Sequence, residues 1–371
     1  MMEKYDRKII LEDGAEYYGY GFGDTSDKVC EIVFNTSMVG YQEIVSDPSY
    51  TYQAVVMTYP LIGNYGICDD DYETNTPTIG ALIVREYNNE PSNFRSVATL
   101  DEIMKKYRIP GVWGVDTRKL TRSIRDHGSR KALITDADTP IEKGIEILRT
   151  STIPTDAVSK VSCKNIWYSR APKERYHVVA IDCGMKQNIV RSLNKRDCSV
   201  TVVPWNTTAE EIEHLTPDGI FISNGPGDPT DVQPVIETIG TLCGKYPIFG
   251  ICLGHQIISL AYGAKTYKLK FGHRGGNHPV RNVETNKIEI TSEDMEKKTL
   301  SDSIIPAYRR FKTWAVQFEE SSFEAKKVIA QQLFERVEIE AGYKIHCTLN
   351  LTYQQFCEEW IKIEKKLPEA S

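Results

Sequence analysis

The sequence predicts an α/β protein: a β-rich α+β domain followed by a domain with a mostly parallel sheet and helices on both faces. Three observations predict this fold class. The first ~150 residues alternate apolar and polar side chains between turn residues, as β-strands do. From His177 onward, short apolar runs alternate with amphipathic stretches of helical length, a pattern typical of βαβ units. The length of 371 residues is enough for two or three domains.

The first domain, residues 1–150, contains strand-rich segments and two helices. The strand candidates are residues 8–23, 30–45, 52–66 and 76–87. Helices are expected over 99–109 and 116–128, and Gly128 is placed to end the second one. Four basic residues of that second helix indicate a solvated face, with a partner surface as the alternative: Arg118, Lys119, Arg122 and Arg125.

Residues 151–175 mix Pro, Thr, Ser and Lys, which predicts a linker. The second domain, residues 176–292, then alternates strand and helix. Strands are expected over 177–184, 199–205, 218–223 and 247–252, and helices over 185–197, 208–215, 234–246 and 253–263. The tail, residues 293–371, has a different pattern: a helix, a hairpin around Ala341-Gly342, and a second helix.

Composition excludes several classes of protein. The net charge of -6 argues against nucleic-acid binding, which needs clustered Lys and Arg. Nine cysteines without a C-x-x-C pair make a zinc site unexpected, and we expect no metal. Their odd number favours free thiols in a reducing cytosol, so a cytoplasmic location is expected. No apolar run approaches the ~20 residues of a membrane span.

Cys252 is the candidate nucleophile. It lies in "PIFGICLGHQ", between Gly250 and Gly254, where a predicted strand turns into a predicted helix. A sharp turn of this kind lifts a nucleophile to the carboxyl end of the sheet, where open α/β folds bind ligands. The N-terminus of the following helix favours the thiolate, and the N–H of Leu253 can stabilise an oxyanion. The alternative is a buried structural cysteine on a glycine-rich turn.

A second loop points to the same edge of the sheet. "SNGPGDP", residues 223–229, follows the strand predicted over 218–223 and has two glycines around Pro226. Its small side chains let backbone groups approach a ligand closely. An ordinary βα turn remains the alternative for this loop taken alone.

These two loops together resemble the class I, triad-type glutamine amidotransferases. Further motifs are similar to the small, glutamine-hydrolysing subunits of carbamoyl phosphate synthetases, over residues ~8–292. They are "LEDG", "FNTSMVGYQEIVSDPSY", "TYPLIGNYG", "SNFR", "GVDTRKLTR" and "KLKFGHRGGNHPV". The resemblance implies that residues 1–150 dock on a large subunit and that 176–292 form the amidotransferase domain.

The resemblance also implies a reaction. The Cys252 thiolate would attack the carboxamide of L-glutamine, release ammonia and leave a thioester for water to hydrolyse. A large subunit would use the ammonia with ATP, Mg and bicarbonate to make carbamoyl phosphate for pyrimidine and arginine biosynthesis. This chain itself would need no cofactor. By motif match, the substrate-binding residues would be Ser37, Gly225, Gly227, Leu253 and Gln256.

The proton acceptor of the triad is not recognisable. The family supplies a His-Pro-Glu sequence, but this chain ends in "KKLPEAS", with Leu367 at the histidine position. Glu369 matches the family's glutamate, yet it would have no imidazole to orient. His255 belongs to the elbow helix and would point away from the thiol, whereas His346 falls on the polar face of a predicted strand. We therefore expect impaired glutaminase activity, because a triad needs its base.

The family's Gln-Asn-His-Gly segment is also missing after "KIEITS", where the chain reads "EDMEKKTL". The tail is similar instead to the tail of large serine recombinases. Four hypotheses follow: a glutaminase subunit, a non-catalytic docking partner of the large subunit, a different cysteine hydrolase, or a recombinase-derived DNA-binding fragment. The acidic charge disfavours the last, and the motifs of residues 1–150 disfavour the third.

Overall fold

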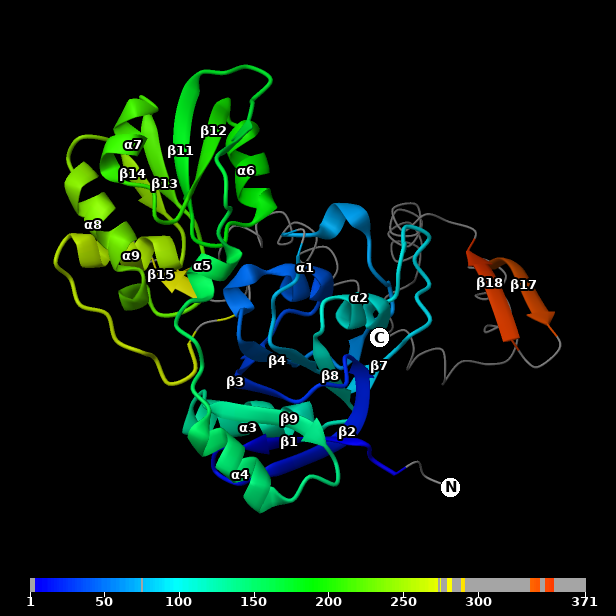
Figure 1. Cartoon of the computed structure of the whole chain (residues 1–371). Coiled ribbons are helices and arrows are strands. Elements are labelled where there is room, and N and C mark those ends of the chain that lie inside the picture. Colours follow the sequence, from blue (N-terminus) through cyan, green and yellow to red (C-terminus); the bar gives the residue numbers. More distant parts are fainter. Residues whose placement is uncertain are drawn as a thin grey trace, which may run out of the picture. The chain divides into compact units, whose positions relative to one another are not determined.

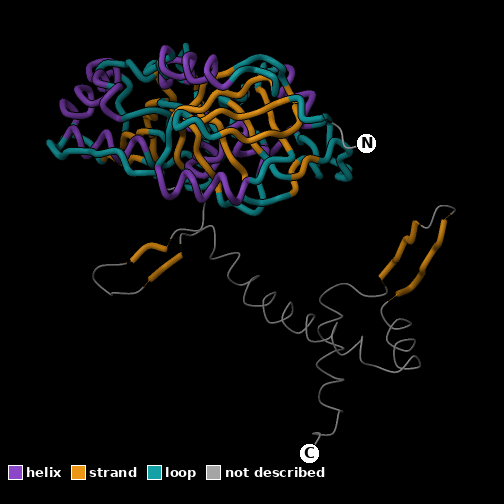
Figure 2. The backbone as a smooth tube through the Cα atoms, turned by 90° about the horizontal axis from the view of Figure 1, so that it is seen from below, coloured by secondary structure: helices purple, strands orange, loops and turns teal. Residues whose placement is uncertain are grey.

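The computed structural model describes residues 4–74, 76–272, 274, 279–281, 288–290, 334–340 and 344–349. Its internal contacts divide the chain into two compact units, Met1–Glu289 and Ile290–Ser371. The first unit contains a closed barrel and an open sheet. Figure 2 shows the strands of this unit with helices on either side of them.

The barrel is formed by strands of the first domain, joined in the order β1-β2-β8-β6-β4-β3-β9 (Figure 1). Parallel pairing joins β3 to β4, β4 to β6 and β6 to β8, and the other pairs are antiparallel. The strands are β1 (Arg7–Leu11), β2 (Glu16–Gly23), β3 (Lys28–Asn35), β4 (Gln53–Met57), β6 (Ala81–Ile83), β8 (Pro110–Trp113) and β9 (Lys131–Asp136).

The two faces of the barrel strands bury separate apolar clusters, because alternate side chains of a strand point to opposite faces. Val33 and Val55 are register partners and belong to one cluster, which includes residues of helices α1 (Tyr41–Ser46) and α2 (Leu100–Lys106). Ile32 and Ala54 are the next register pair and belong to the other, with Leu120 and Ile124 of α3 (Thr117–His127). Helix α4 (Ile141–Thr150) packs on β1 and β9.

Short elements complete the connections of the barrel. They are η1 (Pro48–Tyr50), η2 (Asp69–Asp71) and the parallel pair of β5 (Leu61–Ile62) with β7 (Glu86–Tyr87). The two helices predicted in this domain are confirmed as α2 and α3, and Gly128 is the C-cap of α3. The basic residues of α3 are exposed, as expected for a solvated face: Arg118, Lys119, Arg122 and Arg125.

The strand prediction for residues 30–45 is wrong in its second half. Residues 41–46 form helix α1, because Tyr41, Ile44 and Val45 are spaced to bury one helical face in the barrel cluster. The candidate at 76–87 is also divided: β6 belongs to the barrel, and β7 pairs with β5 instead. In both places tertiary packing decides between structures that local alternation alone does not separate.

The open sheet has the strand order β10-β12-β11-β13-β14. Strands β12, β11, β13 and β14 run parallel, and β10 pairs antiparallel with β12 at the edge. The strands are β10 (Trp167–Ser169), β11 (Tyr176–Asp182), β12 (Cys198–Pro204), β13 (Gly219–Ile222) and β14 (Ile248–Gly250). The mostly parallel sheet of the second domain is therefore confirmed.

Helices cover both faces of this sheet, as the sequence predicts (Figure 1). One face buries residues of α7 (Ala209–His214), α8 (Gln233–Leu242) and α9 (Leu253–Ala261), and the other packs against α6 (Gln187–Asn194). Val179 and Ile181 of β11 face the first group, and Ala180 between them faces the second. The short η3 (Pro229–Asp231) precedes α8.

The segment 151–175 is more than a linker. It contains helix α5 (Ala157–Val161) and strand β10, and Val158 of α5 is buried in the core of the open sheet. A strand of three residues is too short to show a period of two in the sequence, and its Pro-, Ser- and Lys-rich neighbours indicated a linker instead.

In the later part of the chain the structure describes four strands. They are β15 (Pro279–Arg281), β16 (Ile288–Ile290), β17 (Phe334–Glu340) and β18 (Lys344–Leu349). Strands β17 and β18 pair antiparallel, which confirms the predicted hairpin, and His346 lies opposite Glu338 in its register. The second tail helix lies outside the described residues, and so does nearly all of the first.

Candidate active site

Cys252 lies at the turn between β14 and α9, where it is the N-cap residue of the helix. Its backbone has φ 53° and ψ -109°, a conformation that residues with a Cβ rarely adopt. The turn is closed by the N–H of Gly254, which donates to the Ile251 carbonyl at 2.9 Å. Solvent reaches Cys252, whereas Leu253 beside it is buried in the core. This is the strained elbow that the G-x-C-x-G pattern predicts.

The elbow has no room for a side chain at position 250, which is a glycine. A Cβ at Gly250 would lie 2.5 Å from the carbonyl carbon of Gly254, inside van der Waals contact with the backbone of the next turn. Any larger residue would push the helix away from the strand and displace the sulfur.

Two opposing effects act on the Cys252 thiol. Although solvent reaches the residue, neighbouring protein atoms partly desolvate the thiol and so raise the pKa of Cys252 above its ordinary value, and the carboxylate of Asp47 adds to this. The Leu253 N–H and the cations Lys186 and Arg274 act in the opposite direction, since they favour the thiolate. The net result is a raised pKa, so a proton acceptor is needed to make the thiol a good nucleophile at neutral pH.

The charged groups around the sulfur come from both parts of the first unit. Asp47 follows α1 of the barrel, and Lys186 precedes α6 of the open sheet. Lys186 Nζ pairs with Asp47 Oδ2 at 2.7 Å, and the Asp47 side chain is buried. Burial acts to lower the pKa of Lys186, but the ion pair with Asp47 overcomes it and the pKa is raised. The pair therefore brings a barrel carboxylate and a sheet cation into the surroundings of Cys252.

The predicted loop 223–229 lies at the same edge of the sheet. Gly225 is buried against the carbonyl of Cys183 and the side chain of Leu253, where a Cβ would not fit. Asn224 joins the loop to the barrel, because its Nδ2 donates to Ser49 Oγ at 3.0 Å. Gly227 is exposed and has φ 87°. The loop thus places Gly225 next to Leu253 and leaves Gly227 open to solvent.

Ser37 and Gln256, the other predicted substrate residues, come from different elements. Ser37 follows β3 of the barrel, is half-buried, and donates its N–H to Asn35 Oδ1 at 2.7 Å. Gln256 lies in the first turn of α9, is exposed, and donates its N–H to the Cys252 carbonyl at 3.1 Å. Glu369, predicted for the triad, and Leu367, which stands at the histidine position, lie outside the described residues.

The segment after α9 crosses onto the barrel, and we call its described residues, 268–272 and 274, the strap. Lys268 Nζ pairs with Glu31 at 2.5 Å, and the Lys270 carbonyl accepts from the Ser129 N–H at 2.8 Å. Phe271 packs on Phe34 with ring centroids 5.7 Å apart and joins the barrel cluster. The strap ends at Arg274, whose carbonyl accepts from Thr36 Oγ1 at 3.5 Å. Thr36 is the neighbour of Ser37.

Sequence reasoning missed Asp47, Lys186 and Arg274. Lys186 carried a usable signal, since it follows the first strand of the open sheet at the carboxyl edge where ligands bind. Asp47 lies within the quoted motif at residues 34–50, but nothing in that motif indicates that Asp47 reaches the elbow, which it does only through the docking of the barrel. Arg274 lies within the quoted motif at residues 268–280, but the motif gives no direction for its side chain.

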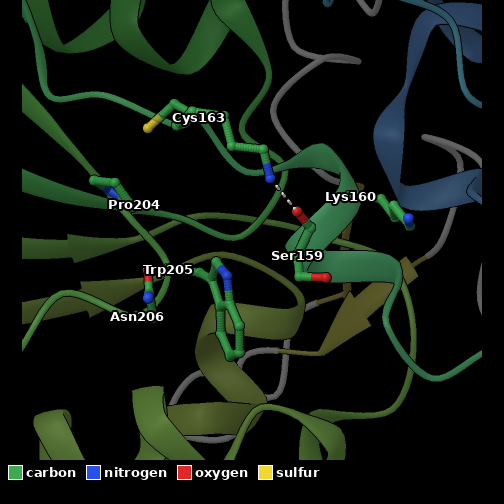
Figure 3. Close-up of a pocket in the computed structure, with 7 residues that line it drawn as sticks. Ser159, Lys160, Cys163, Pro204, Trp205 and Asn206 are labelled. Atoms are coloured by element: carbon green, nitrogen blue, oxygen red, sulfur yellow. Dashed lines mark hydrogen bonds between the residues drawn. The ribbon is translucent and has the colours of Figure 1, made fainter.

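A hollow of about 390 Å³ opens beside the carboxyl end of β12 (Figure 3). Lys164 Nζ donates to the Ser159 carbonyl at 2.8 Å, and Lys160 pairs with Asp156 at 3.6 Å. Both cations are therefore satisfied by the protein itself. The residues predicted to hold glutamine do not line this hollow.

Among the helices of the described residues, none is long and apolar enough to cross a bilayer.

A parallel sheet that carries a cysteine elbow and a glycine loop at its carboxyl edge fits a class I glutamine amidotransferase domain. The family model "Glutamine amidotransferase class-I" matches residues 179–329, which extends past residue 292 where the motif resemblance stops. The model "Carbamoyl-phosphate synthase small chain, CPSase domain" matches residues 9–134, the span of the barrel.

Curated relatives agree with both matches. The chain is 53% identical over 290 residues to the carbamoyl phosphate synthase small chain of Fusobacterium nucleatum subsp. nucleatum, covering 78% of this chain and 80% of the relative. It is 54% identical over 288 residues to the small chain of Bacillus cereus, covering 78% of each. The pyrimidine-specific small chain of Halalkalibacterium halodurans is 52% identical and covers 78% of this chain and 79% of its own. The chain belongs to the carbamoyl phosphate synthase small chain family.

Proposed function

We propose that Cys252 hydrolyses L-glutamine and that the ammonia passes to a large synthetase subunit. The sulfur attacks the carboxamide carbon, and the carbonyl oxygen becomes an oxyanion near the Leu253 N–H. Collapse of this intermediate, with the former thiol proton transferred to the amide nitrogen, expels ammonia and leaves a γ-glutamyl thioester, which water hydrolyses to glutamate and the free thiol. The observation that supports this proposal is that Cys252, with φ 53°, lies at the N-terminus of α9.

The substrate-binding residues form the second part of the proposal. Gly225 and Leu253 would contact glutamine beside the sulfur, and Gln256 and Gly227 would close the site from the solvent side. Ser37 would reach in from the barrel, supported by its place next to Thr36, which contacts the strap. The large subunit would supply the ATP and Mg chemistry in the cytoplasm, serving pyrimidine and arginine biosynthesis, while this chain needs no cofactor.

We further propose that turnover by this chain is impaired. The raised pKa of Cys252 leaves most of the thiol protonated at neutral pH, so the step depends on a base. Leucine at position 367 cannot accept a proton, and Glu369 cannot then act through an imidazole. Loss of a triad histidine typically costs on the order of 10³–10⁶ in turnover.

The test is a glutaminase assay on the full chain, which measures glutamate release with and without a large subunit. The Fusobacterium nucleatum small chain serves as the intact control, and Cys252→Ser as the inactive one. We expect slow release that Cys252→Ser abolishes. Turnover equal to the intact control would overturn the impairment, and release that survives Cys252→Ser would overturn the role of Cys252.

A non-catalytic docking partner is the second candidate, and Leu367 is the observation that favours it. Such a chain would keep the barrel as a docking module, while the large subunit used external ammonia. Binding to the large subunit without any Cys252-dependent glutamate release would decide for this candidate.

A further inference from the structure

The loop between β7 and α2 carries an aromatic side chain that the rest of the fold does not use. Phe94, in the "SNFR" motif, is 96% exposed, and Val97 three residues later is 62% exposed. Residues 91–97, which we call the Phe94 loop, lie on the barrel, far along the chain from Cys252 (Figure 1). Exposure of one apolar residue is ordinary, but an almost fully exposed phenylalanine is a large apolar surface to leave in water.

The backbone that carries Phe94 is held in place on both sides. The N–H of Ser92 donates to the Asn64 carbonyl at 3.0 Å, and the N–H of Val97 donates to the Ile67 carbonyl at 2.9 Å. Within the loop, the Ser96 N–H donates to the Asn93 carbonyl at 3.0 Å. The exposed ring therefore projects from a fixed support, which reduces the entropy lost when a partner covers it.

The surroundings of Phe94 are acidic. Its neighbour Arg95 contacts Asp70 at 3.3 Å and Asp71 at 3.4 Å, which places the loop against the triple aspartate of η2. One guanidinium cannot neutralise three carboxylates, and Asp69 and Asp70 remain exposed. A partner surface that fits here presents an apolar socket with Lys or Arg at its edge.

We propose that Phe94 and Val97 anchor the large synthetase subunit, with the η2 aspartates as the acidic rim of that contact. The inference rests on the proposed function, because it requires that this chain docks on a large subunit. Aromatic residues on a preorganised support are the usual hot spots of protein interfaces, and their truncation commonly weakens binding by about 30-fold or more. Charged rim residues act mainly on the association rate and on its salt dependence.

The experiment measures binding of the full chain to the large subunit of the Fusobacterium nucleatum enzyme, with that organism's own small chain as positive control. Three variants are compared with the unchanged chain: Phe94→Ala, Asp70→Lys and the control Tyr168→Ala. Tyr168 is an exposed aromatic, at 65%, on β10 of the other domain. Thermal unfolding of each variant verifies that it is folded.

We expect Phe94→Ala to weaken binding at least about 30-fold, Asp70→Lys to slow association most at low salt, and Tyr168→Ala to bind like the unchanged chain. If the unchanged chain does not bind while the positive control does, the proposed docking function fails. If the unchanged chain binds and Phe94→Ala binds equally well, the docking function stands and the Phe94 anchor is overturned. Concentration-dependent self-association that Phe94→Ala removes, with unaltered subunit binding, overturns it as well.

Discussion

At the scale of single residues, Cys252 combines a strained backbone with an unfavourable ionisation. A backbone at φ 53° costs stability, because the Cβ crowds the neighbouring peptide. Burial and Asp47 both act against the thiolate that the proposed chemistry needs. Both features are typical of functional sites, where the surrounding structure holds a side chain in a position that local energetics oppose.

The strain at Cys252 predicts an order of stabilities among its variants. Cys252→Gly removes the Cβ, whereas Cys252→Ala keeps it, so the two variants differ mainly in the strained contact. We expect the Gly variant to be more stable by about 1 kcal/mol, the relief of strain exceeding the entropic cost of glycine. Urea unfolding of both measures the difference, and an Ala variant at least as stable as the Gly variant would contradict the strain.

The acid–base environment predicts the effect of Asp47→Asn. The carboxylate raises the pKa of Cys252, and its removal also frees the charge of Lys186 to act on the sulfur. The pKa of Cys252 should fall, so the thiolate fraction at neutral pH should rise. We expect faster alkylation of Cys252 by iodoacetamide at pH 7, with the midpoint of the rate–pH curve moved to lower pH.

Mass spectrometry can follow this alkylation at Cys252 selectively. Burial raises the pKa of Cys30 and of Cys163 to about 12, so these thiols react slowly at pH 7. Asp156→Asn, which changes an acid of the barrel–sheet connection that is not among the groups shifting the pKa of Cys252, is the matched control. An unaltered midpoint in Asp47→Asn would show that the Asp47 charge does not reach the sulfur.

At the scale of elements, the strap links the elbow to the barrel. Phe271 inserts among barrel side chains, and Arg274 at the end of the strap favours the Cys252 thiolate. The barrel thereby contributes to the site through two routes, the strap and the Asp47–Lys186 pair. A helix and a strand of the open sheet supply the sulfur, but the charges that act on it depend on barrel contacts.

The strap predicts two effects of Phe271→Ala. Loss of a partly buried ring should lower the free energy of unfolding by about 1–2 kcal/mol, less than for a fully buried phenylalanine. Release of the strap should also move Arg274 away and slow the alkylation of Cys252 at pH 7. Tyr267→Ala, which truncates an aromatic that is 83% exposed, is the control and should leave both measurements unaltered. If Cys252 in Phe271→Ala is alkylated at the normal rate, the strap does not influence the reactivity of Cys252.

At the scale of the whole molecule, the barrel and the open sheet have separate apolar cores. The clusters of the barrel lie between Ile9 and Leu148 and take only Phe271 from later in the described sequence. Those of the sheet begin at Val158. The contacts that join the two include polar pairs, such as Tyr52 with Asp156 at 2.9 Å.

Separate cores predict that residues 1–150 fold without the rest of the chain. A closed barrel with its own clusters has no strand edge that requires a partner. We expect the fragment to unfold in a single cooperative transition, measured by circular dichroism in urea. A fragment without a cooperative transition would show that the barrel depends on the open sheet.

Much of the fold was predictable because its signals are local. The strand–helix alternation after His177, the C-cap at Gly128, and the hairpin around Ala341-Gly342 depend on neighbours in the sequence. Helix α1 and strand β10 were not predictable, since α1 competes with a strand signal and β10 is three residues long. Their structure is decided by what they pack against.

The sequence by itself determined the family, the cysteine elbow and the glycine loop, because each is a short stretch whose residues act together along the chain. Only the tertiary structure decided what surrounds the sulfur. Asp47, Lys186 and Arg274 act on Cys252 from three separate places in the chain. Electrostatic effects depend on distance in space, and spacing along the sequence does not report that distance.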